Sequence, residues 1–197
     1  MGMTLGAVGD FFMAGLLQPI IPLPNAALGG MGAFGMGHAA YIAGCQNAHN
    51  RAGLHDQKAK WTAILIWQVI GLIGWYFVVY PTKAEHLQIL RWPALGYTLL
   101  LACTTGMGSS LAAQNRRFMI LAVGGGLFLL SDLILAWRMF RGPFPHATEA
   151  VWIPYGSGQM MIVFAITTAF SALIAKPESR RSGESWDSSN SLRREAN

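Results

Sequence analysis

Charged residues are scarce in this chain. Lys, Arg, Asp and Glu make up 12% of its 197 residues, about half the share that a soluble domain carries. Hydrophobic residues make up 53% of the total, and they gather in runs of about 20 residues separated by short polar pieces. The scarcity of charge and the length of these runs exclude an ordinary soluble domain and predict a polytopic, helical, integral membrane protein.

Cysteine is scarce as well. The two cysteines, Cys45 and Cys103, are too few for a disulfide framework, and we interpret both as small packing residues. The net charge of +5 does not indicate a nucleic-acid partner, because the basic residues lie at the ends of the apolar runs and in the C-terminal region. In those places Lys and Arg act as topology signals and contact lipid headgroups.

The apolar runs predict an all-α bundle of about six transmembrane helices, which together form a transmembrane domain over residues 1–175. The expected spans are residues 2–17, 28–45, 61–80, 92–113, 118–139 and 151–175. The polar residues 46–60 are expected to form a loop. Residues 176–197 are rich in Ser and in both signs of charge, which predicts a disordered cytoplasmic tail.

Basic residues are distributed unequally between the two ends of the expected bundle. Ten of the 14 Lys and Arg residues belong to the end that holds both termini. The other end holds four, which are Lys83, Arg91, Arg138 and Arg141. Because cytoplasmic ends carry the excess of Lys and Arg, this asymmetry predicts that both termini are cytoplasmic.

Acidic residues are almost absent from the apolar runs, and the two exceptions are Asp10 and Asp132. A charge at bilayer depth costs at least about 2.5–3.5 kcal/mol on insertion scales, so an intramembrane acid is a candidate for function. Burial disfavours the ionised form of a carboxyl group, and two acids that face one cavity are expected to leave one protonated and one ionised. General acid–base hydrolysis needs that combination. The alternative is that each acid is structural and hydrogen-bonded to a neighbouring helix.

Other polar residues inside the runs are candidates for substrate binding. They are His38, Tyr41, Ser131, Tyr155 and Gln159. His38 and Tyr41 share one helical stripe, as do Tyr155 and Gln159, and Ser131 lies beside the second acid. We expect these stripes to face one common cavity, because polar groups avoid lipid; the alternative is that they only pack and hydrogen-bond between helices.

Other hydrolytic chemistries lack the residues that they need. A zinc hydrolase wants about three His or carboxylate ligands, and His38 is the only histidine inside a span, so neither a metal nor another cofactor is expected. No Gly-x-Ser-x-Gly nucleophile elbow and no phosphate-binding loop is present in the sequence.

Taken together, these residues resemble the motifs of the YhhN-like lysoplasmalogenase family. The most specific element is Gly-x-x-Phe-x-x-Ser-Asp at residues 125–132. The other elements, in matching order, are Gly9-Asp10, Gly32-Ala33-Phe34 followed by His38 and Tyr41, and Tyr155 with Gln159. The resemblance covers about residues 5–175. That family usually has eight spans, so the resemblance implies that the first two are absent from this chain.

The resemblance implies an integral membrane hydrolase that cleaves the vinyl ether bond of lysoplasmalogens to a fatty aldehyde and a glycerophospho-base. Its substrate is a lysophospholipid within membrane lipid. It implies that Asp10 and Asp132 are the catalytic aspartates, one as the proton donor and the other as the base, without saying which is which. The alternative, from another class, is a non-catalytic transporter or lipid-binding protein with a buried pair of aspartates.

Overall fold

The computed structural model describes residues 1–23 and 25–170, and every regular element in this part of the chain is helical. The all-α prediction is therefore confirmed. The elements are α1 (Gly2–Met13), α2 (Ala26–Ala52), α3 (Gln57–Val78), α4 (Glu85–Gln88), α5 (Arg91–Gln114), η1 (Arg116–Phe118), α6 (Met119–Arg141), α7 (Ala147–Ala165) and η2 (Ile166–Phe170). The predicted tail and the last residues of the sixth expected span lie outside the described residues.

Each of the six expected spans corresponds to one helix, which in the first span ends already at Met13, but the number of membrane crossings stays a prediction. Within the described residues, three helical segments are long and apolar enough to cross a membrane, and they are Gln57–Val78, Arg116–Arg141 and Ala147–Thr168. The 12 residues of α1 extend over about 18 Å, well short of a hydrocarbon core of about 30 Å.

The polar segment that follows the second apolar run is largely helical, so the prediction of a loop over residues 46–60 is wrong for most of its length. Helix α2 continues into this segment as far as Ala52, and the Gln46 side chain donates a hydrogen bond to Asn50 Oδ1 at 3.1 Å. Such pairs four residues apart stabilise an exposed helix. The helix ends where Gly53 adopts a left-handed conformation with φ of 66°, which glycine tolerates without steric cost.

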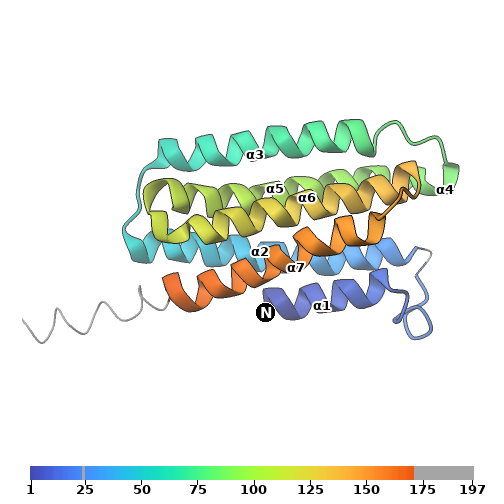
Figure 1. The fold of residues 1–197 in the computed structure, drawn as a ribbon, viewed down its shortest axis with the longest axis horizontal. Coiled ribbons are helices and arrows are strands. Elements are labelled where there is room, and N and C mark those ends of the chain that lie inside the picture. Colours follow the sequence, from blue (N-terminus) through green and yellow to red (C-terminus); the bar gives the residue numbers. More distant parts are fainter. Residues whose placement is uncertain (24, 171–197) are drawn as a thin grey trace, which may run out of the picture.

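The six long helices run side by side, and α3 and α1 lie on opposite faces of the bundle (Figure 1). Helix α5 packs against α2, α3 and α6, while α1 packs on α2 and α7 packs on α6. The connections α1–α2, α3–α5 and α6–α7 all lie at the end of the bundle where α4 is found (Figure 1). We call this the α4 end.

Small residues let some of these helices approach very closely. A Cβ atom placed on Gly158 of α7 would lie 2.8 Å from the carbonyl oxygen of Gly124 on α6, and one on Gly106 of α5 would lie 2.6 Å from the Cα of Ile64 on α3. Close backbone approach of this kind is typical of helix packing in membranes.

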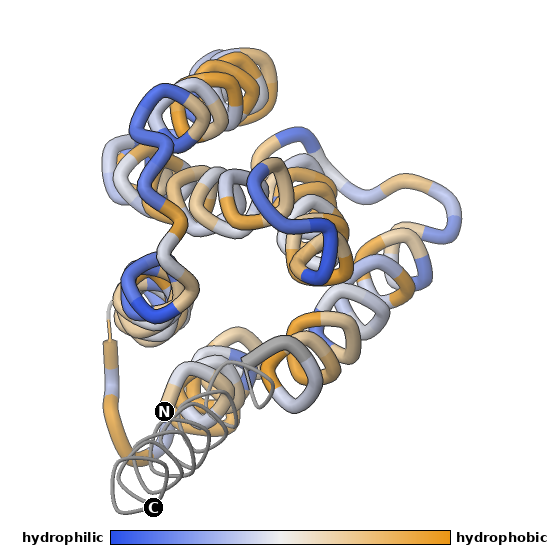
Figure 2. Tube along the Cα trace, turned by 90° about the vertical axis from the view of Figure 1, so that its left-hand side faces the viewer, coloured by the Kyte–Doolittle hydropathy of each residue, from blue (hydrophilic) through white to orange (hydrophobic). Residues whose placement is uncertain are grey.

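Hydrophilic residues gather in the connections and at the helix ends, whereas the helix bodies are mainly hydrophobic (Figure 2). Helix α3 shows this most clearly, since its outer face exposes large apolar side chains. They are Leu65, Ile66, Val69, Ile70, Leu72, Ile73 and Phe77. A lipid environment accommodates such a face, which would be unfavourable in water.

Candidate functional site

The two acids inside the apolar runs line one cavity. This cavity has a volume of about 550 Å³ and lies at the α4 end. Asp10 comes from α1 and Asp132 from α6, and both side chains are partly buried. The remaining lining residues are Phe11, Met13, Ala14, Leu16, Phe34, Ser131, Leu135, Arg138, Met139, Val151, Trp152 and Tyr155. The fold thus brings together two carboxyl groups from opposite ends of the sequence.

Asp10 is held by a tyrosine from α7. The Tyr155 hydroxyl donates a hydrogen bond to Asp10 Oδ2 at 2.7 Å. One helical turn further along, Gln159 Nε2 donates to the Tyr155 hydroxyl at 3.4 Å. The predicted stripe of Tyr155 and Gln159 therefore faces α1, and Gln159 contacts the carboxyl group only through the tyrosine.

Asp132 is held in the same way by a tyrosine that the sequence analysis did not single out. The Tyr97 hydroxyl, on α5, donates a hydrogen bond to Asp132 Oδ2. One signal was available in the sequence, because a tyrosine hydroxyl inside an apolar run needs a hydrogen-bond partner when it is buried. Each aspartate at this cavity is therefore fixed by a phenol from a different helix, and in both cases the bond occupies Oδ2.

The packing of α1 against α2 explains why the residue before Asp10 is a glycine. A Cβ atom on Gly9 would lie 2.7 Å from the ring of Phe34 on α2. Its absence lets the Phe34 ring lie against α1 and form part of the cavity wall. The ring also lies 6.4 Å from that of Tyr97, measured between centroids. Phe34 thus connects the surroundings of the two aspartates.

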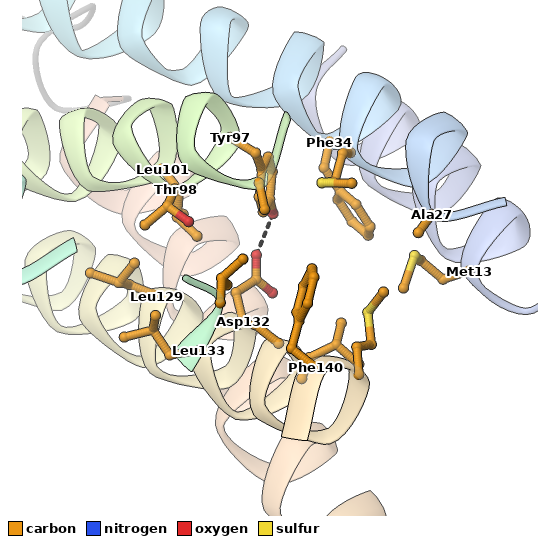
Figure 3. Close-up of a pocket in the computed structure, with 16 residues that line it drawn as sticks. Met13, Ala27, Phe34, Tyr97, Thr98, Leu101, Leu129, Asp132, Leu133 and Phe140 are labelled. Carbon is orange, nitrogen blue, oxygen red and sulfur yellow. Dashed lines mark hydrogen bonds between the residues drawn. The ribbon is translucent and has the colours of Figure 1, made fainter. Parts of the chain in front are cut away.

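A narrower apolar recess of about 60 Å³ borders the cavity and shares five lining residues with it. The shared residues are Met13, Phe34, Asp132, Leu135 and Met139. In Figure 3 the Asp132 carboxyl group points toward Tyr97, with hydrophobic side chains such as Leu129 and Phe140 around it. Asp132 therefore lies where the larger cavity meets the apolar recess.

Comparison with known proteins agrees with the motifs. A sequence model of the YhhN family matches residues 1–166. The chain belongs to the YhhN family. The lysoplasmalogenase TMEM86B of Sus scrofa is 33% identical over 109 residues, a match that covers 47% of this chain and 47% of that protein. The chain thus spans about half the length of this curated relative. No solved structure matches it.

Membership of the YhhN family confirms the resemblance derived from the sequence, and together with the three apolar helices it identifies the chain as a membrane protein. The orientation of the termini stays a prediction.

His38 and Tyr41 do not reach the cavity of this YhhN-family protein. His38 is 3% exposed, and its ring packs against those of Phe128 and Tyr97, with centroids 5.2 and 5.9 Å away. The His38 ring therefore lies next to Tyr97, the tyrosine that holds Asp132. Tyr41 lines a different cavity of about 340 Å³ beside Gly2. The expectation that all polar stripes face one cavity does not hold for these two residues.

Ser131 borders the cavity but is engaged between helices. Its side chain is fully buried, and Oγ donates a hydrogen bond to the carbonyl oxygen of Val151 on α7 at 2.9 Å. The serine next to Asp132 therefore links α6 to α7 at the depth of the cavity. Through this link it helps to hold the helix that carries the aspartate.

Proposed function

We propose that this YhhN-family chain is a membrane hydrolase that cleaves the vinyl ether bond of lysoplasmalogens, producing a fatty aldehyde and a glycerophospho-base. The observation that supports this most is that Asp10 and Asp132 line one cavity. The family and the similarity to a protein named lysoplasmalogenase support the class of reaction.

Vinyl ether hydrolysis requires an acid and a base near the same bond. A protonated aspartic acid transfers its proton to the carbon β to the ether oxygen. The electrons of the double bond form the new C–H bond, and a lone pair of the ether oxygen stabilises the positive charge left on the α carbon as an oxocarbenium ion. The second aspartate, ionised, stabilises this cation and takes a proton from water as the water oxygen bonds to the α carbon. The resulting hemiacetal gives up its hydroxyl proton, the bond to the glycerol oxygen breaks, and that oxygen takes a proton. The net reaction consumes one water molecule.

The tyrosines have a positioning role in this scheme. Tyr155 and Tyr97 each donate to the Oδ2 atom of an aspartate, which leaves the Oδ1 atoms for substrate and water. A hydrogen bond to a fixed phenol restricts the rotation of a carboxyl group, and reacting groups held in place lower the entropic part of the barrier.

The apolar recess is suited to the part of the hydrocarbon chain next to the vinyl ether. Its wall includes Met13, Met31 and Met139, and methionine side chains are flexible enough to adapt to an alkyl chain. With the chain on this side of Asp132, the glycerophospho-base occupies the roomier cavity.

Aldehyde release by the purified protein tests the proposal. In neutral detergent, a 1-alkenyl lysophosphatidylcholine is expected to yield fatty aldehyde, and the saturated 1-alkyl analogue is expected to yield none. Asp10→Asn and Asp132→Asn should each lower kcat by about 100-fold or more while the protein elutes as a folded species on size-exclusion chromatography.

Retained turnover in both variants would refute the acid–base scheme. Binding of the ether analogue without any aldehyde release by the unmodified protein would favour the non-catalytic, lipid-binding alternative.

A further inference from the structure

Three arginines lie near the α4 end, and two of them are used within the fold. Arg91 donates through Nη2 to the carbonyl oxygen of Thr82 at 3.0 Å. Arg141 donates through Nε to the carbonyl oxygen of Val78 at 3.2 Å. Arg138 differs, because among the described residues it has no hydrogen bond and no ion pair, and its side chain is exposed.

Arg138 is the only cationic side chain among the described residues that line the cavity of the two aspartates. It follows Asp132 by six residues on α6, which places its backbone about 9 Å closer to the α4 end along the helix axis. It makes no ion pair with Asp10 or Asp132 within the described chain. Along α6 the cavity therefore has the Asp132 carboxyl group deeper and the Arg138 guanidinium group nearer to the end of the bundle.

Three other side chains that line this cavity are apolar and exposed. Phe11, Leu16 and Trp152 are 49%, 62% and 55% exposed. A large aromatic ring and a basic side chain at the end of a membrane helix are typical of the zone where hydrocarbon meets lipid headgroups. The position of Arg138 thus combines access to the cavity with the depth at which phosphate groups lie.

We propose that Arg138 binds the phosphate of the lysophospholipid headgroup and makes the cavity selective for ether lipids that carry a phosphate. This inference rests on the proposed function. The planar guanidinium group matches phosphate oxygens with two parallel hydrogen bonds. In a lysoplasmalogen the vinyl ether and the phosphate lie at the two ends of one glycerol unit. An arginine that holds the phosphate therefore places the ether bond deeper, on the side of Asp132.

A comparison of two substrates tests this proposal. The first is 1-alkenyl lysophosphatidylcholine and the second is 1-alkenylglycerol, which has the same ether bond and no phosphate. For Arg138→Gln, the ratio of kcat/KM between the first and the second substrate should fall about 10- to 100-fold, the range for losing a hydrogen bond to a charged group. Arg138→Lys should recover part of this ratio, because lysine keeps the positive charge but cannot form the two parallel hydrogen bonds of a guanidinium group.

The matched control is Arg117→Gln, which removes an exposed arginine in η1, at the opposite end of the bundle. This control should leave the ratio unchanged. An equal loss with both substrates in Arg138→Gln would show that the arginine acts on the aspartates or on the fold, and would overturn the proposal. An unchanged ratio would overturn it as well.

A binding measurement separates this proposal from the proposed function. Radiolabelled saturated 1-alkyl lysophosphatidylcholine cannot be cleaved, so its affinity is measurable whether or not the protein is an enzyme. Affinity that falls about tenfold or more in Arg138→Gln, with 1-alkylglycerol affinity unaffected, supports the phosphate site even if no aldehyde is released. Equal affinity in both proteins, or no binding at all, refutes it.

Displacement of the label by inorganic phosphate as effectively as by unlabelled lysolipid would assign the site to free phosphate and also refute the lipid proposal.

Discussion

Replacing Tyr97 by phenylalanine removes the hydroxyl group that donates to Asp132 and keeps the ring. The ring has its own neighbours, since its centroid lies 6.4 Å from that of Phe34 and 5.9 Å from that of His38. The variant therefore tests the hydrogen bond with little change in packing.

The size of the effect follows from the kind of bond. A hydrogen bond to a charged group contributes about 1.5–3 kcal/mol, and each 1.36 kcal/mol in a barrier is a factor of ten in rate. Loss of the bond from Tyr97 to Asp132 should therefore lower kcat for aldehyde release by about 10- to 150-fold. KM should change little, because the hydroxyl contacts the aspartate and the Tyr97 ring remains in the wall of the apolar recess.

The control is Tyr76→Phe on α3. Tyr76 is 52% exposed and its ring stacks on that of Tyr80 with centroids 5.3 Å apart, so the same chemical change is made at a residue that lines neither the cavity nor the apolar recess. We expect unchanged kcat for this variant. Unchanged kcat in Tyr97→Phe would refute the positioning role, and so would a rise in KM that accounts for the whole loss.

Two further predictions concern stability and are measured by thermal unfolding in detergent. Gly158→Ala should destabilise the protein by about 1–3 kcal/mol, because the new Cβ would lie 2.8 Å from the backbone oxygen of Gly124. The control Gly156→Ala places its Cβ in open space and should be neutral or stabilising. Equal melting temperatures for the two variants would contradict the close approach of α6 and α7. Ser131→Ala should cost about 0.5–1.5 kcal/mol, because the bond to the Val151 carbonyl oxygen is lost; an unchanged melting temperature would show that this bond contributes nothing.

The helices could be predicted from the sequence to a large extent, because the apolar runs are long and their separators are polar or contain proline. The ends of the helices could not. Helix α2 extends past the apolar run because side-chain pairs such as Gln46 and Asn50 stabilise turns that have few apolar residues. Helix α4 has four residues, too few to show any periodicity.

The two acids of the candidate site could be predicted from the sequence, but their hydrogen-bond partners only in part. Asp10 and Asp132 stood out because nothing else acidic lies in an apolar run, and the spacing of Tyr155 and Gln159 placed them on one face. The spacing does not say which neighbouring helix a face meets. Tyr97 was missed for that reason, since its role depends on the packing of α5 against α6.

The two aspartates lie at different depths, which limits how the proposed substrate can reach them. Asp10 is three residues from the end of α1 and Asp132 is nine residues from the end of α6, which is about 5 and 13 Å along the helix axes. Asp10 therefore lies near the α4 end, whereas Asp132 lies close to the middle of α6 and close to the centre of a hydrocarbon core of about 30 Å. In a lysoplasmalogen the bond to be cleaved lies at the boundary between headgroup and chain. The two acids can meet that bond when the glycerophospho-base enters the cavity and the chain stays among the hydrophobic side chains of the apolar recess.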